Sequence, residues 1–486
     1  MKQSKVWLIP FFVCGLFYYP VIANNLMYMD DTFRAISGFD GWGVSGRPLA
    51  DFIMHRLMMK SSYLIGYGQL GQLLSVSIMA ITSLIIAKKL FAGDGWHKYF
   101  LCSGFALNPF FLENMSYQYD SLTMTISLCL SVIAAVIVWE KGVYYFFGAV
   151  ALITAASSLY QTSLNSYIGF FAASVIIKTA SNYASPKSLF LACIKGALAA
   201  ALATLAYMLI IRIAIPMTND RGNMLSVSSG YIEYFFSLSL RAYSLLVNTL
   251  SYKFSFIALL FMIITAITGV IKNDDKLVRL ALVIISSFVV YFSMVGIISL
   301  IRDQYISSRI LMGGSAITFL FFALAGLYFV PKWASVPASI IVMLPLFLVS
   351  YSYGFAAKYQ REHDTANINF AINDIRNDDK FDQKSYIVFS GKMPVAPVAS
   401  HTVQKFDLVS LMLMPSYDWT ASMIAQSWGV SGVRFNFARA EQKETVALVC
   451  KKGAPKISET NSYAIYRNGD KNGYLVWMKG AKKNPC

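Results

Sequence analysis

The sequence predicts a mainly α-helical, polytopic membrane protein that ends in a small α/β domain. The chain has 486 residues, of which 56% are hydrophobic and only 14% are charged, and its mean hydropathy is +0.54. Soluble domains carry about 25% charged residues, so this composition excludes both a soluble and a disordered chain. The formal net charge of +16 alone would suggest nucleic acid as a partner, but the positions of the charges indicate membrane topology instead.

A helix needs about 20 mostly apolar residues to cross a bilayer. The apolar stretches predict about eleven transmembrane helices, at residues 6–23, 64–87, 98–112, 121–139, 143–159, 163–178, 189–215, 254–271, 278–300, 310–330 and 334–354. The third stretch is short, and its Asn108-Pro109 pair predicts a break or a re-entrant segment.

The positive-inside rule gives an orientation for these helices. With Lys2 and Lys5 in the cytoplasm, the inner loops hold a clear excess of Lys and Arg over Asp and Glu, whereas the outer loops are nearly balanced. An odd number of spans then places the C-terminal end outside. Residues 2–23 also fit a signal peptide with a weak cleavage site, which would leave the next loop on the same outer side.

A change of composition near residue 357 marks a domain boundary. We therefore expect residues 1–356 to form the transmembrane domain and residues 357–486 a small α/β domain on the outer face. The short apolar segments of this domain predict strands at 386–390, 447–450, 463–466 and 474–478, and helices at 364–377 and 420–428. Cys450 and Cys486 could pair in an oxidising compartment or remain as two free thiols.

The cysteine and histidine residues do not predict a metal centre. The six Cys are scattered without a CxxC pair, and the four His lie far apart in the chain. We therefore expect no cofactor and no metal site. A divalent metal held by Asp30, Asp31 and Asp120 is the alternative.

The first outer loop, residues 24–63, carries the first candidate site. Asp30 and Asp31 follow the first span directly, and carboxylates at a membrane edge are costly unless they are solvated, paired or used. Such a carboxylate could act as the general base for a hydroxyl nucleophile. Arg34 and Arg47 would order this loop or bind substrate. Alternatively, the two Asp residues cap the exit of the span and pair with Arg34.

The outer loop 113–120 and the turn after the fifth span carry a second candidate site. Glu113 and Asp120 could orient sugar hydroxyls by hydrogen bonds. Tyr117 could stack on the apolar face of a pyranose. The alternative is an interfacial aromatic belt with solvated acids. Residues 160–161 (Tyr160 and Gln161) could complete this site or form an ordinary interfacial turn.

Arginine residues in the outer loops 216–252 and 301–309 predict an anion site. Arg302 and Arg309, joined by Arg221, could bind a phosphate because the planar guanidinium matches phosphate oxygens in a fork. Snorkelling to lipid headgroups is the alternative. The assigned topology places all these polar clusters on one face, while the spans carry almost no charge, which argues against a transporter.

Several of these residues form a recognisable set of motifs: Asp30-Asp31-x-x-Arg34, Gly46-Arg47-Pro48-Leu49, Glu113-Asn114-x-x-Tyr117-x-x-Asp120 and Tyr160-Gln161. Over residues 1–355, this set resembles the type II glucosyltransferases, the serotype-converting O-antigen glucosyltransferases encoded by bacteriophages and prophages of enteric bacteria. Position 118 is Gln where the family pattern has a basic residue. The resemblance implies a GT-C-like fold in the bacterial inner membrane, with a periplasmic active site and C-terminal domain.

The resemblance also implies the reaction. Undecaprenyl-phosphate-glucose would be the donor, and a sugar of the O-antigen polysaccharide or of its lipid-linked repeat would be the acceptor, so that the lipopolysaccharide serotype changes. Asp31 or Asp30 would be the base of an inverting displacement. A bactoprenol glucosyltransferase and a small flippase would be functional partners, and nucleic acid would not. An O-antigen polymerase or ligase and a polyprenol-linked sugar flippase are the alternatives.

Overall fold

A computed structural model of the chain describes residues 6–59, 63–91, 95–181, 184–214, 231–251, 263–264, 266–267, 270–271, 275–296, 306–327, 332–435, 446–447, 454–468 and 473–480. The chain divides into two compact units. The helical unit comprises Met1–Asn25, Asp40–Ser62 and Tyr67–Tyr351, and the C-terminal unit comprises Leu26–Phe39, Tyr63–Gly66 and Ser352–Cys486. The first outer loop is thus divided between the two units.

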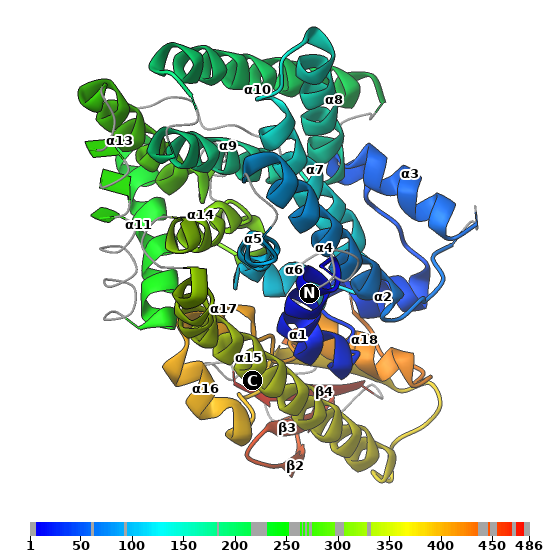
Figure 1. The fold of residues 1–486 in the computed structure, drawn as a ribbon. Helices are drawn as coiled ribbons and strands as arrows, with labels where there is room; N and C mark the ends of the chain where they lie inside the picture. Colours follow the sequence, from blue (N-terminus) through cyan, green and yellow to red (C-terminus); the bar gives the residue numbers. More distant parts are fainter. Residues whose placement is uncertain are drawn as a thin grey trace. The chain divides into compact units, whose positions relative to one another are not determined.

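The described part of the helical unit contains helices and no strand (Figure 1). Its elements are α1 (Leu8–Asn24), the 3-10 helix η2 (Gly43–Ser45), α3 (Pro48–Leu57), α4 (Leu70–Leu90), α5 (His97–Cys102), the 3-10 helix η3 (Ser103–Leu107), α6 (Phe111–Ser116), α7 (Ser121–Ile137), α8 (Val143–Leu159), α9 (Ser163–Ala180), α10 (Pro186–Ala214), α11 (Tyr231–Leu250), α13 (Lys276–Ser293), the 3-10 helix η6 (Ser308–Ile310), α14 (Gly314–Leu327) and the first part of α15 (Lys332–Arg376).

Helix α7 lies at the centre of the packing in this unit. It packs against α4, α8 and α9, while α9 also packs against α13 and α14, and α10 packs against α8. Nearly every side chain of α7 is buried. This fits its composition, because a helix that is apolar on all sides is stable only where other helices surround it.

The apolar helices identify a membrane protein. Among the described residues, α4, α10 and α13 are long and apolar enough to cross a membrane, and α1, α7, α8 and part of α14 are shorter apolar helices. The predicted count of eleven spans is not confirmed, in part because the stretch 254–271 lies mostly outside the described residues. The predicted outer loops 24–63 and 216–252 contain helices of their own, α2 (Asp30–Ser37) and α3 in the first and α11 in the second.

The third predicted span is broken, as its Asn-Pro pair predicts. Asn108 is extended, because a residue before proline disfavours the helical conformation. Its side-chain oxygen accepts a hydrogen bond from the backbone N–H of Phe110 at 3.1 Å, and its amide donates to Ser315 Oγ at 3.2 Å. Residues 101–120 are buried throughout, so η3, α6 and the end of α5 belong to the interior of the helical unit.

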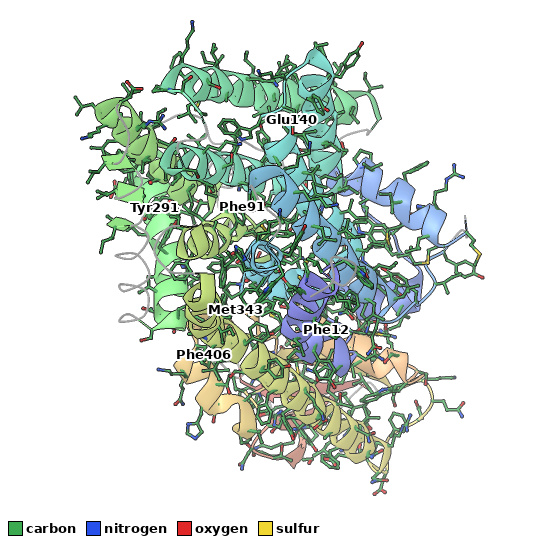
Figure 2. The ribbon with its side chains drawn as sticks, in the orientation of Figure 1. Phe12, Phe91, Glu140, Tyr291, Met343 and Phe406 are labelled. Carbon is green, nitrogen blue, oxygen red and sulfur yellow. The ribbon has the colours of Figure 1, made fainter. Side chains whose placement is uncertain are left out.

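Predicted cytoplasmic residues gather at one end of the helices. Lys89, at the end of α4, donates to the Glu140 carboxylate at 2.7 Å, and Lys195 of α10 donates to the Glu140 backbone carbonyl at 2.7 Å (Glu140 is labelled in Figure 2). Glu140 follows α7, whereas Asp120 precedes it. The predicted inner and outer residues therefore lie at opposite ends of α7.

The C-terminal unit combines helices with a mixed four-stranded sheet. Its elements are α2, the remainder of α15, β1 (Tyr386–Lys392), the 3-10 helix η7 (Pro397–Ala399), α16 (Ser400–Lys405), α17 (Asp407–Met412), α18 (Asp418–Ser427), β2 (Lys456–Glu459), β3 (Tyr463–Arg467) and β4 (Gly473–Lys479). The strand order is β1-β4-β3-β2, with β1 parallel to β4 and the other two pairs antiparallel.

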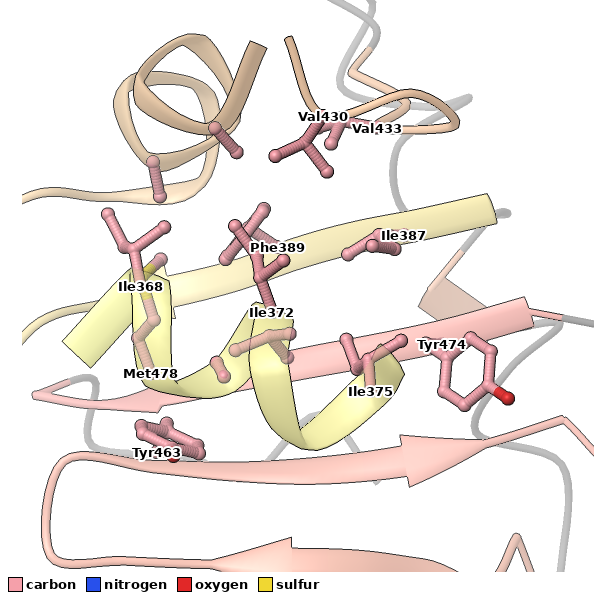
Figure 3. Close-up of a cluster of buried hydrophobic side chains, with 14 of the residues drawn as sticks. Ile368, Ile372, Ile375, Ile387, Phe389, Val430, Val433, Tyr463, Tyr474 and Met478 are labelled. Carbon is pink, nitrogen blue, oxygen red and sulfur yellow. The ribbon is translucent and has the colours of Figure 1, made fainter. Parts of the chain in front are cut away.

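The end of α15 packs on this sheet (Figure 3). Ile368, Ile372 and Ile375 recur at helical spacing and pack against a cluster that includes Phe389 of β1. Beyond the helix end, Asp378 accepts two hydrogen bonds from Arg467 and one from Tyr474, each at 2.7 Å. These contacts fix the end of the helix to strand β3 and the start of β4.

Most of the predicted elements of this unit are confirmed, with two corrections. The strands at 386–390, 463–466 and 474–478 and the helix at 420–428 are present, but β2 escaped prediction. In the predicted strand 447–450, Ala447 is helical and the remainder lies outside the described residues, as do Cys450 and Cys486. Residues 334–354 and 364–377 were expected as two helices but form the single helix α15, because the helix-forming segment between them does not interrupt it.

Candidate functional site

The predicted site residues fall into two groups. Asp30, Asp31 and Arg34 belong to the C-terminal unit. Arg302 and Arg221 lie outside the described residues. The others belong to the helical unit, where the structure brings them together: Arg47, Glu113, Tyr117, Asp120, Tyr160, Gln161 and Arg309.

The first contact in the helical unit joins α6 to η6. The Glu113 carboxylate accepts a hydrogen bond from the backbone N–H of Arg309 at 2.9 Å, and the Arg309 guanidinium donates to the Tyr117 hydroxyl at 2.6 Å. Glu113 is only 3% exposed. Burial raises the pKa of Glu113, and the nearby Arg309 charge and backbone hydrogen bonds oppose that rise.

The second contact joins the first outer loop to the start of α7. Asp120 accepts a hydrogen bond from Trp42 Nε1 at 2.5 Å and lies 3.8 Å from the Arg47 guanidinium. Trp42 is 1% exposed and Asp120 is 3% exposed. Trp42 was not among the predicted site residues. Its position between two glycines, five residues before Arg47, is the sequence feature that points to it.

The third contact joins the same loop to the turn before α9. The Gln161 amide donates to the backbone carbonyls of Ser45 at 2.9 Å and Gly46 at 3.2 Å, and Arg47 Nε donates to Gln161 Oε1 at 3.4 Å. Gly46 has a φ of +77°, which a residue without Cβ adopts without strain. A Cβ here would lie 2.8 Å from Gln161 Nε2.

Tyr160 links these contacts into one network. The Arg47 guanidinium lies 4.4 Å from the centre of the Tyr160 ring. Burial raises the pKa of Tyr160, the charges of Arg309 and Arg47 oppose the rise, and those of Glu113 and Asp120 add to it. Most of this network is buried, so in this conformation it holds the loop and the helix ends together, and Arg47, Gln161 and Arg309 are partly exposed members of it.

In the C-terminal unit, Asp30 and Asp31 begin helix α2 and differ from each other. Asp31 is fully buried, and its carboxylate accepts a hydrogen bond from the backbone N–H of Tyr28 at 3.0 Å. Asp30 is half-buried, and its carboxylate makes no hydrogen bond or ion pair with any residue that the structure describes. Asp31 therefore stabilises the start of the helix, whereas the Asp30 carboxylate has no partner among the described residues.

The residue before this pair is strained. Met29 has φ 50° and ψ −113°, a conformation that L side chains rarely adopt and that costs about 1–3 kcal/mol. Arg34, on the next turn of α2, is buried and donates to the backbone carbonyl of Phe39 at 3.3 Å. Strain of this kind is common at functional sites.

Met29 also lines a cavity of about 50 Å³ within the C-terminal unit. Residues 26–29, Thr32, residues 353–364 of α15 and residues 412–420 contribute side chains to its wall. Arg361 is the basic residue of this wall. Burial lowers the pKa of Arg361, and the Asp364 carboxylate opposes this effect. Arg361 was not among the predicted site residues; it lies between the two helices predicted at 334–354 and 364–377.

One other group of side chains has the composition of a cation site. Ligand atoms of Asp40, Asp51 and His55 lie within 4.8 Å of one another in the helical unit, and all three residues are partly exposed. Burial raises the pKa of Asp51, and the neighbouring His55 opposes the rise. These residues differ from Asp30, Asp31 and Asp120, the predicted alternative for a divalent metal.

Comparisons with known proteins identify relatives of the chain. A family model described as Glucosyl transferase GtrII matches residues 19–325. An uncharacterized 55.3 kDa protein in the gtrB 5′ region of Salmonella phage P22 is 33% identical over 177 residues, and the match covers 36% of each chain. No solved structure matches.

Proposed function

The chain belongs to the Glucosyl transferase GtrII family and is a glucosyltransferase, and on this basis we propose that it transfers glucose from undecaprenyl-phosphate-glucose to a sugar of the O-antigen repeat. The observation that carries the mechanism is the unpartnered, half-buried Asp30 carboxylate beside a strained residue at the start of α2. The acceptor is the O-antigen polysaccharide or its lipid-linked repeat, and the product is a lipopolysaccharide of changed serotype.

Asp30 acts as the general base. It accepts the proton of the acceptor hydroxyl while that oxygen forms a bond to the anomeric carbon and the bond from this carbon to the lipid phosphate breaks. The displacement inverts the anomeric configuration, and the electron pair of the broken bond stays on the phosphate. A carboxylate without other partners suits this role, because a proton acceptor must reach the hydroxyl rather than a backbone N–H. Asp31 supports Asp30 by holding the helix start.

The network of the helical unit binds sugar after rearranging. Glu113, Asp120 and Gln161 supply hydrogen bonds to hydroxyl groups, and Tyr117 and Tyr160 supply aromatic faces. Arg309, with Arg302 and Arg221, contributes positive charge for the donor phosphate. The partly exposed Arg47 and Gln161 support this proposal, since they offer a route for substrate to displace the contacts now made within the network.

Acceptor recognition is assigned to the C-terminal unit. A groove of about 520 Å³ runs along α15 and is lined by Glu362, Asn369, Arg376 and Trp428, among others. Trp428 is 44% exposed. An exposed indole between amide, carboxylate and guanidinium groups suits a carbohydrate, whose apolar face stacks while its hydroxyls form hydrogen bonds. Trp428→Ala should raise the KM for the acceptor several-fold with little change in kcat.

The site is proposed to face the periplasm of a bacterial inner membrane, with the N-terminus in the cytoplasm. The gathering of Lys89, Lys195 and Glu140 at one end of the helices supports this orientation. A bactoprenol glucosyltransferase would then supply the donor and a small flippase would turn it over.

The test is transfer of labelled glucose from purified undecaprenyl-phosphate-glucose to O-antigen by the full-length protein in membranes. We expect transfer by the wild type and inversion at the anomeric carbon. Failure of well-inserted wild-type protein with the correct acceptor would contradict the proposal. Polymerisation of repeats or movement of the lipid without transfer would instead indicate the polymerase or flippase alternatives.

A further inference from the structure

The cavity beside Met29 has the size of a phosphate group. Its volume is about 50 Å³, and a buried water needs roughly 10–15 Å³ measured in this way. The cavity therefore holds about four atoms the size of water, which is close to a tetrahedral oxyanion. It lies within the C-terminal unit and is lined by both neighbours of the Asp30-Asp31 pair, Met29 and Thr32.

Arg361 supplies a positive charge to the cavity wall. It is partly buried, the Asp364 carboxylate acts on its charge, and its guanidinium makes no hydrogen bond or ion pair with the residues that the structure describes. The nearby Asp364 carboxylate is occupied by other donors, since it accepts hydrogen bonds from Gln360 Nε2 at 2.7 Å and the backbone N–H of Ser416 at 2.6 Å. A guanidinium in such a position is costly unless an anion pairs with it.

Thr32 adds a hydroxyl donor to the same cavity. Thr32 is 4% exposed, and its hydroxyl makes no hydrogen bond with any described residue. Thr32 lies two residues after Asp30 in helix α2. The cavity thus combines a buried hydroxyl and a guanidinium, which are common donors to phosphate oxygens. Its wall also includes Met29, the residue directly before the proposed base Asp30.

The remaining wall favours a lipid phosphate over a free one. It is rich in apolar side chains, with Leu26, Met27 and Leu413 among them, and Met27 is 38% exposed. Two segments of the wall follow apolar stretches. Residues 26–29 come just after α1 ends at Asn24, and residues 353–364 begin where the apolar stretch of α15 ends near residue 354. The ends of membrane-crossing apolar stretches are expected at the edge of a bilayer, where lipid headgroups are found.

We propose that this cavity binds the phosphate of a polyprenyl-phosphate sugar, with Arg361 pairing with the phosphate oxygens and Thr32 donating to them. The assignment rests on the proposed function and adds two residues to it. Arg361 stabilises the charge that collects on the phosphate as its bond to the sugar breaks.

The test measures binding of undecaprenyl phosphate to the purified full-length protein, with undecaprenol and inorganic phosphate as parallel ligands. We expect Arg361→Ala to weaken undecaprenyl phosphate binding 10- to 100-fold, Arg361→Lys to weaken it less and Thr32→Val to weaken it several-fold. Undecaprenol binding should not change. Arg56→Ala is the matched control, since Arg56 is exposed and contacts the ring of Phe52.

Two outcomes would overturn the assignment. One is wild-type affinity of Arg361→Ala for undecaprenyl phosphate, and the other is an equal loss of affinity for undecaprenol, which would indicate a general loss of lipid binding. Arg361→Lys, checked for an unchanged thermal unfolding temperature, guards against misfolding. If the wild type transfers glucose while Arg361→Ala binds undecaprenyl phosphate and transfers glucose normally, the assignment of this cavity to the lipid phosphate is refuted and the proposed function stands. Arg361-dependent binding without any transfer by the wild type refutes the function alone.

Discussion

The two adjacent carboxylates at the start of α2 should respond to substitution in opposite ways. Asp30→Asn removes a proton acceptor but no described contact, so the free energy of unfolding should change by less than about 0.5 kcal/mol. Loss of a general base usually slows a reaction about 10²- to 10⁴-fold, equivalent to roughly 3–5 kcal/mol in the barrier. Asp30→Asn should therefore be a stable, nearly inactive protein.

Asp31→Ala should instead lower stability. The substitution removes a carboxylate from the first turn of α2, where its interaction with the helix dipole contributes up to about 1 kcal/mol, and it leaves the buried N–H of Tyr28 without its acceptor at 3.0 Å, which costs at least about 1 kcal/mol. The sum of about 2 kcal/mol corresponds to a fall in Tm of roughly 4–8 °C for a domain of this size. The remaining folded protein should keep measurable activity.

The assay pairs glucose transfer with thermal unfolding in detergent, normalised to the amount of inserted protein. Asp379→Asn is the matched control, because Asp379 is exposed in the same unit and has no partner among the described residues. The assignment would be refuted by near-normal transfer in Asp30→Asn. Inactivity of Asp31→Asn at unchanged stability would move the base to Asp31.

Three further predictions concern other parts of the chain. Gly46→Ala should reduce glucose transfer and lower the free energy of unfolding by roughly 1–2 kcal/mol, because φ is +77° and the new Cβ would displace Gln161. An unchanged unfolding temperature and unchanged transfer would show that this turn does not position Gln161. Glu113→Ala should lower the free energy of unfolding by about 1–3 kcal/mol, because it leaves the backbone N–H of Arg309 without its buried acceptor at 2.9 Å. Glu113→Gln keeps an acceptor for this N–H and should cost less than half as much; equal losses in thermal unfolding would show that the charge, not the hydrogen bond, is what stabilises the contact. Burial alone would raise the pKa of Asp378, but its hydrogen bonds from the C-terminal sheet lower it. The contribution of the ionised carboxylate to stability is therefore present above about pH 4 and is lost as the pH falls through the lowered pKa. Asp378→Asn should be less stable than the wild type at pH 7, and a difference that persists in unfolding measurements near pH 2 would contradict this.

Much of the fold could be predicted from the sequence, because apolar runs and proline residues determine local structure. The break at Asn108 follows from the steric effect of the next residue, and strand β1 follows from a short apolar run. The continuity of α15 through residues 355–363 could not be predicted so readily, because a mixed segment forms helix or loop according to what it packs against. Strand β2 could not be predicted from the sequence, because its residues, Lys456–Glu459, are mostly polar.

The residues of the candidate site could be predicted from the sequence, but the contacts between them could not. The motifs selected Asp30, Asp31, Glu113 and Asp120, but only three-dimensional contacts distinguish a buried carboxylate that accepts a backbone hydrogen bond from one without a described partner. Arg361 lies hundreds of residues from the Asp pair in the chain, so its place in the same cavity wall is a property of the folded unit. Composition and spacing contain no information on such a long-range contact.

The division of the first outer loop constrains how such genes can recombine. Residues 26–39 and 63–66 fold with the C-terminal unit although they lie near the start of the chain, and they fall inside the region matched by the family model, which ends at residue 325. A crossover near residue 350 would therefore join a new C-terminal unit to the inherited α2. Hybrids between phage-encoded relatives should survive only when both parts descend from one parent or when α2 and α18 remain complementary. Acceptor preference would then be inherited as two separated stretches of sequence rather than as a terminal cassette.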